Sequence, residues 1–461
     1  MQKTLIQLHE ELKNGTTTVE ALVAESKKII NEKEKDVHAL LGMYSDSLID
    51  SQIVKAKAMF VSGEAGILTG IPIVLKDNLL VKGELATAGS KILEHYHAPY
   101  DGTVVRKLKE AGAILIGRAN MDEFAMGGST ENSAYGVTKN PHDLTRVAGG
   151  SSGGSAAVVA YGGVSISLGS DTGGSIRQPA SLCGVVGLKT TYGDVSRYGV
   201  MAMGSSLDQI GPFGTCVSDV EEVYKVITRY DVLDSTSLPL ENRKPKVESI
   251  KKVIGVPRDF INRDGIDKEV LNNFNESLKK LEDSGYTLKD ITIEHLEKAL
   301  SVYYILMPAE VSSNLARYDG IRYGLSHPGE TSIQSYFESR TQGFGPEVRR
   351  RILLGTYVLS SGYYDSYYNK ANLAREMLKK EFERVFQDVD IIATPTSPIP
   401  AFTIGEKSQD PLAMYLADIF TVPVNIVGVL AISVPSGKTE SGLPLGMQFI
   451  APHMGENILY T

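Results

Sequence analysis

The segment from Ala148 to Arg177 reads AGGSSGGSAAVVAYGGVSISLGSDTGGSIR and contains two glycine-flanked serine clusters, at 149–155 and 171–175. Between them, residues 156–160 are typical of a helix, and residues 164–168 alternate apolar and polar side chains as a half-buried strand does. Flexible Gly/Ser linkers carry no such packing surface. Glycines beside a hydroxyl let a substrate approach the backbone closely, so the segment predicts a site for acyl chemistry.

Three other motifs compete for these residues. A phosphate-binding loop needs G-x-x-x-x-G-K-[ST] or G-x-G-x-x-G, and neither occurs in this region. Residues 149–153 match the nucleophile elbow G-x-S-x-G, but that site needs an acid and then a histidine farther along the chain. Only His295, His327 and His453 follow, none in a setting typical of a triad. The triplet 171–173 resembles that of aspartic proteases, whose second carboxylate-bearing copy is absent from this sequence.

A serine activated by lysine instead of histidine remains, and Lys76 is the candidate base. It ends the apolar run 70–76, GIPIVLK, which is typical of a strand buried on both faces. Most lysines are exposed surface charges, whereas a lysine at the end of a buried strand is shielded from water. To act as a base near pH 7 its pKa has to fall by about three units, a shift that burial supplies.

Lys76, Ser151 and Ser175, in the segments 74–78, 149–155 and 169–177, resemble the amidase signature family, whose catalytic set is Ser/cis-Ser/Lys. The resemblance implies that Ser175 is the nucleophile and that Ser151, which follows Gly150 and is expected in a cis peptide, relays the proton to Lys76; it leaves open which adjacent peptide bond is cis. It also implies an oxyanion hole made by the N–H groups of Thr172, Gly173, Gly174 and Ser175. Residues 175–178 are typical of the first turn of a helix, whose free N–H groups favour an oxyanion.

Further segments, among them 120–127, 129–133 and 312–320, are similar to the branch of this family formed by the glutaminase components of tRNA-dependent amidotransferases. That resemblance implies hydrolysis of glutamine and transfer of its ammonia to Glu-tRNA(Gln), and it leaves open whether Asp-tRNA(Asn) is a second acceptor. It implies a heterotrimer with the B and C subunits, in which a partner chain holds most of the charged tRNA and binds ATP and Mg. Proline is expected, but absent, at Ala148, Thr190 and Leu430.

The same resemblance assigns glutamine recognition to three residues. Arg351, within the run Arg349-Arg350-Arg351, binds the α-carboxylate, Asp418 binds the α-ammonium group, and Tyr303 lines the substrate pocket. A planar guanidinium matches a carboxylate through two parallel hydrogen bonds, but this chemistry does not choose among three adjacent arginines.

The composition is typical of a globular enzyme, and the negative net charge limits the partners that this chain alone can bind. The chain has 461 residues, 42% of them hydrophobic, and a formal net charge of -8, so the chain alone is poorly suited to hold a phosphate backbone. Cys183 and Cys216 are too few for a disulfide framework and indicate a reducing compartment, and the scattered histidines predict no metal site and no cofactor in this chain. Neither a signal peptide nor a membrane span is evident, which predicts a cytoplasmic protein without membrane contact.

Alternating apolar runs and helical stretches predict one α/β domain of the amidase signature type, with a mixed, mostly parallel central sheet covered by helices on both faces. We expect N-terminal helices in 1–62, the catalytic core in 63–232, a mainly helical insertion in 250–388 and a return to the sheet in 389–461. Residues 234–250, rich in Pro, Ser and charge, predict a surface connection. A final helix is expected to begin where the sequence stops, so a truncated sequence remains an open interpretation.

Two other functions remain open. A free-standing amidase acting on a small carboxamide would share Lys76, Ser151 and Ser175 but would have no use for Arg351 and Asp418. A non-catalytic assembly component is the other alternative, and it would have no need for the three catalytic residue types.

Overall fold

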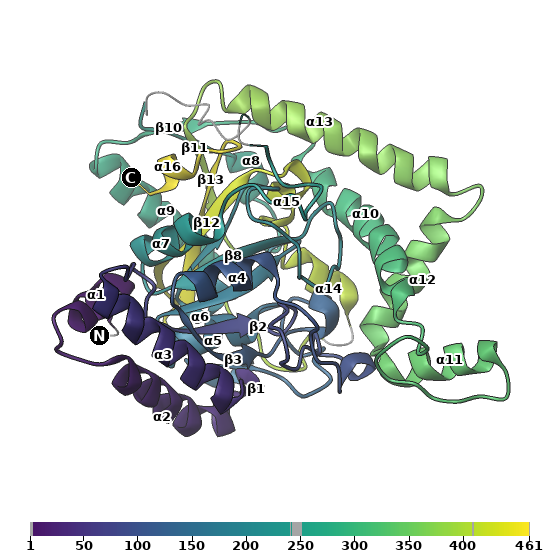
Figure 1. Ribbon diagram of the computed structural model, residues 1–461. Helices are drawn as coiled ribbons and strands as arrows, with labels where there is room; N and C mark the ends of the chain where they lie inside the picture. Colours follow the sequence, from purple (N-terminus) through teal and green to yellow (C-terminus); the bar gives the residue numbers. More distant parts are fainter. Residues whose placement is uncertain (1–2, 240, 242–250, 408–409, 461) are drawn as a thin grey trace.

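A central sheet of eleven strands organises the computed structural model, which describes residues 3–239, 241, 251–407 and 410–460 (Figure 1). From one edge to the other, the strands are β1 (Leu40–Met43), β3 (Ile114–Ala119), β2 (Pro72–Lys76), β6 (Ile166–Asp171), β8 (Gln209–Gly214), β7 (Val186–Lys189), β12 (Leu430–Lys438), β13 (Pro444–Ala451), β11 (Ile391–Pro395), β9 (Val253–Val256) and β10 (Thr287–Asp290). A separate hairpin joins β4 (Lys139–Asn140) to β5 (Asp143–Val147).

The sheet is mixed, as the sequence predicts. Strands β3, β2 and β6 run parallel to one another, as do β11, β9 and β10, while antiparallel pairs fill the middle of the sheet. Because β2 and β6 are parallel neighbours, their carboxyl ends meet at one edge of the layer. Lys76 ends β2 and Asp171 ends β6, so the sheet brings Lys76 and the second serine cluster together.

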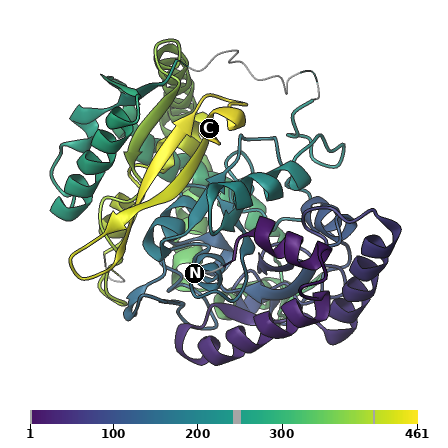
Figure 2. The same cartoon turned by 90° about the vertical axis from the view of Figure 1, so that its left-hand side faces the viewer.

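Helices pack on both sides of this sheet, which confirms the predicted α/β class (Figures 1 and 2). The first half of the chain contributes α1 (Leu5–Lys13), α2 (Val19–Val37), α3 (Asp46–Ser62), α4 (Thr103–Glu110), α5 (Gly153–Ala160), α6 (Arg177–Cys183) and α7 (Val217–Ile227). The second half contributes α8 (Arg258–Ile261), α9 (Lys268–Asp283), α10 (Ala299–Asn314), α11 (Ser332–Gly343), α12 (Pro346–Leu359), α13 (Lys370–Val385), α14 (Pro411–Leu416), α15 (Val422–Val427) and α16 (Glu456–Leu459). None of the helices in these described ranges is long and apolar enough to cross a bilayer.

Local sequence signals account for the N-terminal helices. The Thr4 hydroxyl accepts the N–H of Gln7, and the Gln7 side chain accepts the N–H of Thr4, so α1 begins with a capping box. Thr18 caps α2 as the sequence predicts, by accepting the N–H of Ala21. The apolar face of α2, including Leu22, is buried against the core.

The helical layer formed by α10, α12 and α13 lies far from the N-terminal helices (Figure 1). These helices belong to the stretch 250–388, which the sequence predicts to be mainly helical. The same stretch also supplies β9 and β10 to the edge of the sheet. Most of the expected surface connection at 234–250 falls outside the described residues.

Gly355 sets the distance between α10 and α12. A Cβ atom at Gly355 would lie 1.8 Å from the carbonyl oxygen of Pro308, so only glycine permits this backbone approach. Alanine in a helix interior is otherwise favoured over glycine by about 1 kcal/mol, whereas forcing an extra carbon into a packed contact costs about 1–3 kcal/mol.

We therefore expect Gly355→Ala to lower the free energy of unfolding by roughly 1–2 kcal/mol, because the clash exceeds the gain in helix propensity. Denaturant unfolding followed by circular dichroism measures this change. Leu353→Ala is the matched control on the same helix, since 71% of the Leu353 surface is exposed. A Gly355→Ala protein more stable than the wild type would contradict the close packing of α10 and α12.

Candidate active site

Lys76 occupies the centre of a buried polar cluster at the end of β2. Its Nζ lies 2.8 Å from the Ser151 Oγ, 2.8 Å from the Ser152 Oγ and 3.0 Å from the Ser170 Oγ. The side chain is fully buried. Sequence reasoning placed Lys76 beside Ser151, and the structure adds two further hydroxyls around the same nitrogen.

Burial lowers the pKa of Lys76 to about 7, and the negative charges of Asp122, Asp171 and Asp208 oppose part of this shift. The uncharged amine has a lone pair, which the ammonium form lacks. Lys76 is therefore able to accept a proton near neutral pH, as a general base must.

The first serine cluster forms the loop that brings Ser151 to Lys76. The peptide bond between Gly150 and Ser151 is cis, and the expected cis peptide is therefore the one before Ser151. A Cβ atom at Gly150 would lie 2.2 Å from an oxygen of Asp122, so the loop requires glycine there. Asp122 lies beneath this loop: its N–H donates to the Ser151 carbonyl, and its carboxylate accepts the N–H of Thr130 at 2.9 Å.

A buried ion pair closes the second serine cluster. The Asp171 carboxylate accepts from the Arg177 Nη2 at 3.0 Å and Nε at 3.1 Å, and it also accepts the N–H groups of Gly174 and Ile176. Burial alone would raise the pKa of Asp171, but the Arg177 guanidinium outweighs this effect and lowers it to about 2. The carboxylate therefore stays charged and holds the loop that carries Ser175.

Ser175 lies at the end of this loop with 7% of its surface exposed. Its hydroxyl makes no hydrogen bond to any residue that the structure describes. Of the two hydrogen bonds that the expected proton relay needs, the structure contains the one between Lys76 and Ser151. The described residues show none between Ser151 and Ser175.

The expected oxyanion donors differ in availability. The Gly174 N–H donates to the Asp171 Oδ1 at 2.9 Å, so it is already used. The N–H groups of Thr172, Gly173 and Ser175 donate to no acceptor within the described part of the chain. Helix α6 begins at Arg177, two residues later than predicted, because the Asp171 side chain bonds the N–H groups of Ile176 and Arg177.

Two of the three predicted substrate residues contact the same loop. A Cβ atom at Gly173 would lie 2.9 Å from the Tyr303 hydroxyl oxygen, and one at Gly174 would lie 3.4 Å from the Asp418 Oδ1. Gly173 therefore makes room for Tyr303. At Gly174 the close neighbour is the Thr421 Oγ1 at 2.3 Å, whereas the Asp418 Oδ1 lies at an ordinary contact distance. Tyr303 and Asp418 border the peptide units that precede Ser175.

Burial distinguishes Arg351 from its neighbours. Arg351 is 4% exposed, whereas Arg349 and Arg350 are exposed, so only the third arginine of the run points inward. Its Nε donates to the Glu347 Oε1 at 2.7 Å, and its guanidinium lies 5.8 Å from the Tyr304 ring centre. A cavity of about 310 Å³ lies beside it, lined in part by Ser129, Asn132, Glu347, Arg351 and Tyr415.

The Asp418 carboxyl keeps its proton at neutral pH when no cation is bound. Burial and the negative charge of Asp171 raise the pKa of Asp418 to about 8, although the charges of Arg351 and Arg177 pull it down. A bound ammonium group would favour the ionised carboxylate.

Sequence reasoning missed several residues that complete the site. Ser170 and Ser152 surround Lys76, Asn78 donates to the Ser170 Oγ at 3.0 Å, and Asp122 and Arg177 hold the two loops. The position of Asn78 two residues after Lys76 was a usable signal, because polar residues that follow a buried strand lie at the edge of the sheet. No comparable signal links Arg177 to its partners Asn425 and Gln448, which lie 248 and 271 positions farther along the chain.

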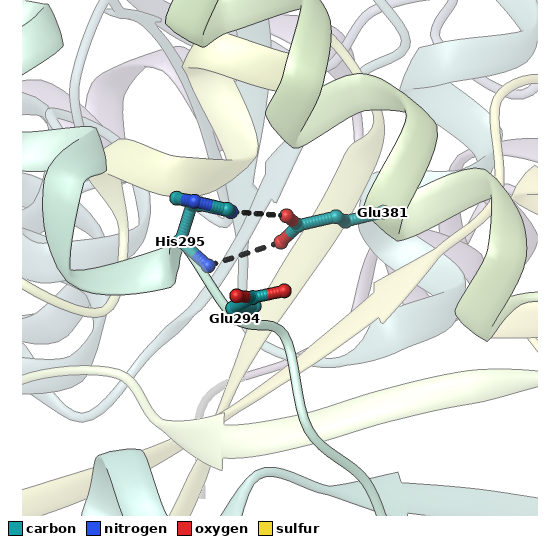
Figure 3. Close-up of side chains that lie close together, drawn as sticks. All are labelled: Glu294, His295 and Glu381. Carbon is teal, nitrogen blue, oxygen red and sulfur yellow. Dashed lines mark hydrogen bonds and ion pairs between the residues drawn. The ribbon is translucent and has the colours of Figure 1, made fainter.

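One group of potential metal ligands occurs in the described residues, at Glu294, His295 and Glu381 (Figure 3). Both oxygens of Glu381 accept hydrogen bonds from His295, one from its backbone N–H and one from its ring (Figure 3). These bonds account for the cluster as a contact between α13 and the segment after β10. It contributes no residue to the cluster around Lys76.

Known proteins resemble the whole chain. The family model described as Amidase matches residues 21–459. The A subunit of glutamyl-tRNA(Gln) amidotransferase from Thermodesulfovibrio yellowstonii is 50% identical over 458 residues, which cover 98% of this chain and 94% of that protein. The protein of the same name from Caldanaerobacter subterraneus subsp. tengcongensis is 50% identical over 469 residues, with 99% and 95% covered.

Solved structures show the same relationship. The crystal structure of the corresponding glutamyl-tRNA(Gln) amidotransferase component from Thermotoga maritima superimposes with a TM-score of 0.79 at 41% identity, covering 99% of this chain and 91% of that one. A crystal structure of an amidase reaches a TM-score of 0.83 at 29% identity, with 99% and 98% covered. The family predicted from the serine and lysine motifs is confirmed: the chain belongs to the amidase family.

Proposed function

We propose that this chain is the glutamine-hydrolysing component of a glutamyl-tRNA(Gln) amidotransferase. The observation that carries the proposal is the placement of Lys76 and Ser151 at hydrogen-bond distance, beside a nucleophile loop that Tyr303 and Asp418 border. Full-length relatives at about 50% identity bear the name of that component.

The reaction begins when the Ser175 hydroxyl attacks the side-chain amide carbon of glutamine. Its proton passes through the Ser151 hydroxyl to the lone pair of Lys76, and the free N–H groups of Thr172, Gly173 and Ser175 donate to the oxyanion. Lys76 returns the proton through Ser151 to the amide nitrogen, the C–N bond breaks and ammonia leaves. A water molecule, deprotonated by the same relay, then hydrolyses the ester on Ser175 and releases glutamate.

The site recognises glutamine through its two charged α-groups. Arg351 receives the α-carboxylate and Asp418 the α-ammonium group. Tyr415 lies between them: its ring centre is 5.9 Å from the Arg351 guanidinium, and its carbonyl accepts the N–H of Asp418. A free-standing amidase for small carboxamides, the alternative function, would need neither the buried Arg351 guanidinium nor the Asp418 carboxyl, which a bound ammonium group would ionise.

The released ammonia serves a second active site on a partner chain. We infer that this chain joins the B and C subunits in a heterotrimer, where a partner binds ATP and Mg and holds the charged tRNA. This chain itself uses no metal or cofactor in the proposed reaction. Its net charge of -8 supports a division of labour in which another chain carries the basic surface. The proposed compartment is the cytoplasm, and Glu-tRNA(Gln) is the primary acceptor, with Asp-tRNA(Asn) as a second one to be tested.

Replacing the nucleophile should stop glutamine hydrolysis. We expect Ser175→Ala to lower ammonia release at least about 10³-fold, because no covalent intermediate forms. Ser155→Ala is the matched control: this buried serine lies in the first serine cluster, and its hydroxyl donates to the Leu168 carbonyl and not to Lys76. Equal ammonia release from wild type and Ser175→Ala would rule out Ser175 as the nucleophile.

The turnover number should depend on the protonation of Lys76. Because the amine must be neutral to accept a proton, we expect kcat to fall about tenfold per pH unit below a pKa near 7. The profile of kcat is preferred to that of kcat/KM, since Asp418 also titrates in the free enzyme, with a pKa of about 8.

Lys189→Met controls for the loss of a buried lysine from the core. Burial also lowers the pKa of Lys189, but its Nζ donates to the Thr190 carbonyl and to Gln209 instead of a serine. We expect this variant to keep the acid limb of the profile. A wild-type kcat that stays constant between about pH 5.5 and 8 would contradict a lysine base.

The assembly is tested by co-purification. Tagged chain expressed in its native host should retain two partner polypeptides, and the purified complex should convert Glu-tRNA(Gln) to Gln-tRNA(Gln) with glutamine and ATP. The Ser175→Ala complex should perform this conversion with free ammonium but not with glutamine. A chain that purifies alone, hydrolyses simple amides and ignores glutamine would instead support the free-standing amidase.

A further inference from the structure

Glu123 is a buried carboxylate that no step of the proposed reaction uses. Only 2% of its surface is exposed, and it lies in the short 3-10 turn η2 (Glu123–Ala125) next to the loop of Ser151. Its Oε2 accepts the backbone N–H of Gly345 at 2.8 Å, and its Oε1 accepts the Ser90 hydroxyl. A Cβ atom at Gly345 would lie 2.4 Å from the Glu123 Oε2, so the contact requires glycine at that position.

Gly345 is the residue from which α12 begins. It is the N-cap of the helix, and it has no side chain with which to satisfy the first N–H groups. A carboxylate at a helix N-terminus bonds these donors and interacts favourably with the helix dipole. Glu123 therefore fixes the start of the helix that carries Glu347 and Arg351 in its first two turns.

The other end of this connection lies at the catalytic loop. Asp122, the residue before Glu123, donates its N–H to the Ser151 carbonyl at 3.2 Å and accepts the N–H of Thr130. Two adjacent residues thus bond different parts of the site, the Ser151 loop and α12. A shift of Glu123 would change the position of Arg351 relative to Ser151.

The backbone after Glu123 has an unusual conformation. Phe124 and Ala125 have positive φ angles of 48° and 63°, a conformation that residues other than glycine rarely adopt. The Phe124 ring packs against Tyr318 and Phe344, with ring centres 4.9 Å and 5.8 Å apart. This packing stabilises the unusual backbone and directs the Glu123 carboxylate toward Gly345.

Ser90 supplies a second route from Glu123 to the base. Ser90 follows the turn 87–89, in which the N–H groups of Thr87 and Gly89 donate to the carboxylate of Asp77. Asp77 is the residue after Lys76. Glu123 is consequently connected to both halves of the Lys76–Ser151 pair.

We propose that Glu123 is a positioning residue for substrate recognition: by bonding Gly345 it sets the place of Arg351, and so of the α-carboxylate of glutamine, relative to the catalytic serines. This inference rests on the proposed function, because it takes Arg351 to be the carboxylate-binding residue. A displacement of about 1 Å between substrate and catalytic groups is enough to cost roughly a hundredfold in rate.

The test compares two variants on two substrates, using the full-length chain in the complex from which it is purified. Glu123→Ala removes both hydrogen bonds. Glu123→Gln keeps them, because its carbonyl oxygen accepts the Gly345 N–H and its NH₂ group donates to Ser90. The substrates are glutamine and 4-aminobutanamide, which is glutamine without its α-carboxylate.

We expect Glu123→Ala to raise KM for glutamine at least about tenfold while changing kcat/KM for 4-aminobutanamide less than about threefold. Glu123→Gln should restore the KM for glutamine to within about threefold of the wild type. Glu94→Ala, which removes a partly exposed carboxylate paired with Lys91, is the control and should leave the kinetics on both substrates unchanged.

A structural role alone would give a different pattern. Equal losses on both substrates, or no change of KM in Glu123→Ala, would overturn the proposal. If Glu123→Ala does not fold, as judged by its Tm, Glu123→Asp carries the same test, since its carboxylate is one methylene too short to reach Gly345. A wild-type complex that releases no ammonia from glutamine would refute the proposed function and this inference with it, whereas an active wild type with unaffected variants refutes the inference alone.

Discussion

The buried ion pair between Asp171 and Arg177 is the constraint on which the site depends. Neither side chain is exposed, and removing two charges from water is costly unless hydrogen bonds replace the lost hydration. Here the replacement is extensive: Asp171 accepts from two backbone N–H groups, while Arg177 donates to the Thr421 carbonyl and to Gln448. Ser175 lies on the loop between the pair, and the Asp171 carboxylate holds this loop through the N–H groups on either side of Ser175. These contacts join the end of β6, the loop and the C-terminal segments next to Ser175.

The burial of Lys76 lowers the stability of the folded state at neutral pH. The folded-state pKa of about 7 lies below the value of about 10.4 for an unfolded lysine, so at neutral pH and below the unfolded chain binds the proton more tightly. This difference destabilises the folded state by about 4 kcal/mol, and the penalty declines as pH rises from 7 toward 10. The apolar core around β2, in which Ile73, Val74 and Leu75 are fully buried, offsets it.

Much of the fold and the centre of the site could be predicted because their signals are local. The apolar run that ends in Lys76, the two serine clusters and the helix between them all correspond to elements of the structure, as does the strand 391–395. The start of α6 could not be placed, since a side chain six residues earlier, Asp171, competes for its first N–H groups.

Contacts between distant segments were less predictable. The sequence pattern could not choose Arg351 from three adjacent arginines; the resemblance chose it, and the structure shows that it is the inward one. Strands β9 and β10 are four residues each, too short for an alternating pattern to stand out. The sequence could not predict that Asp122 holds the Ser151 loop. Its partners are backbone groups, which every residue has, so no residue type in the sequence indicates the contact.

The close contacts of Gly173 and Gly174 determine when the site can form during synthesis of the chain. The side chains that press on these glycines belong to Tyr303 and Thr421, and Arg177 finds further partners at Asn425 and Gln448. Synthesis proceeds from the N-terminus, so Lys76, Ser151 and Ser175 all leave the ribosome long before the residues that shape their loop. The emerging chain therefore carries every reactive group of a hydrolase without the surroundings that organise them, and competence is acquired only when nearly the whole polypeptide is available.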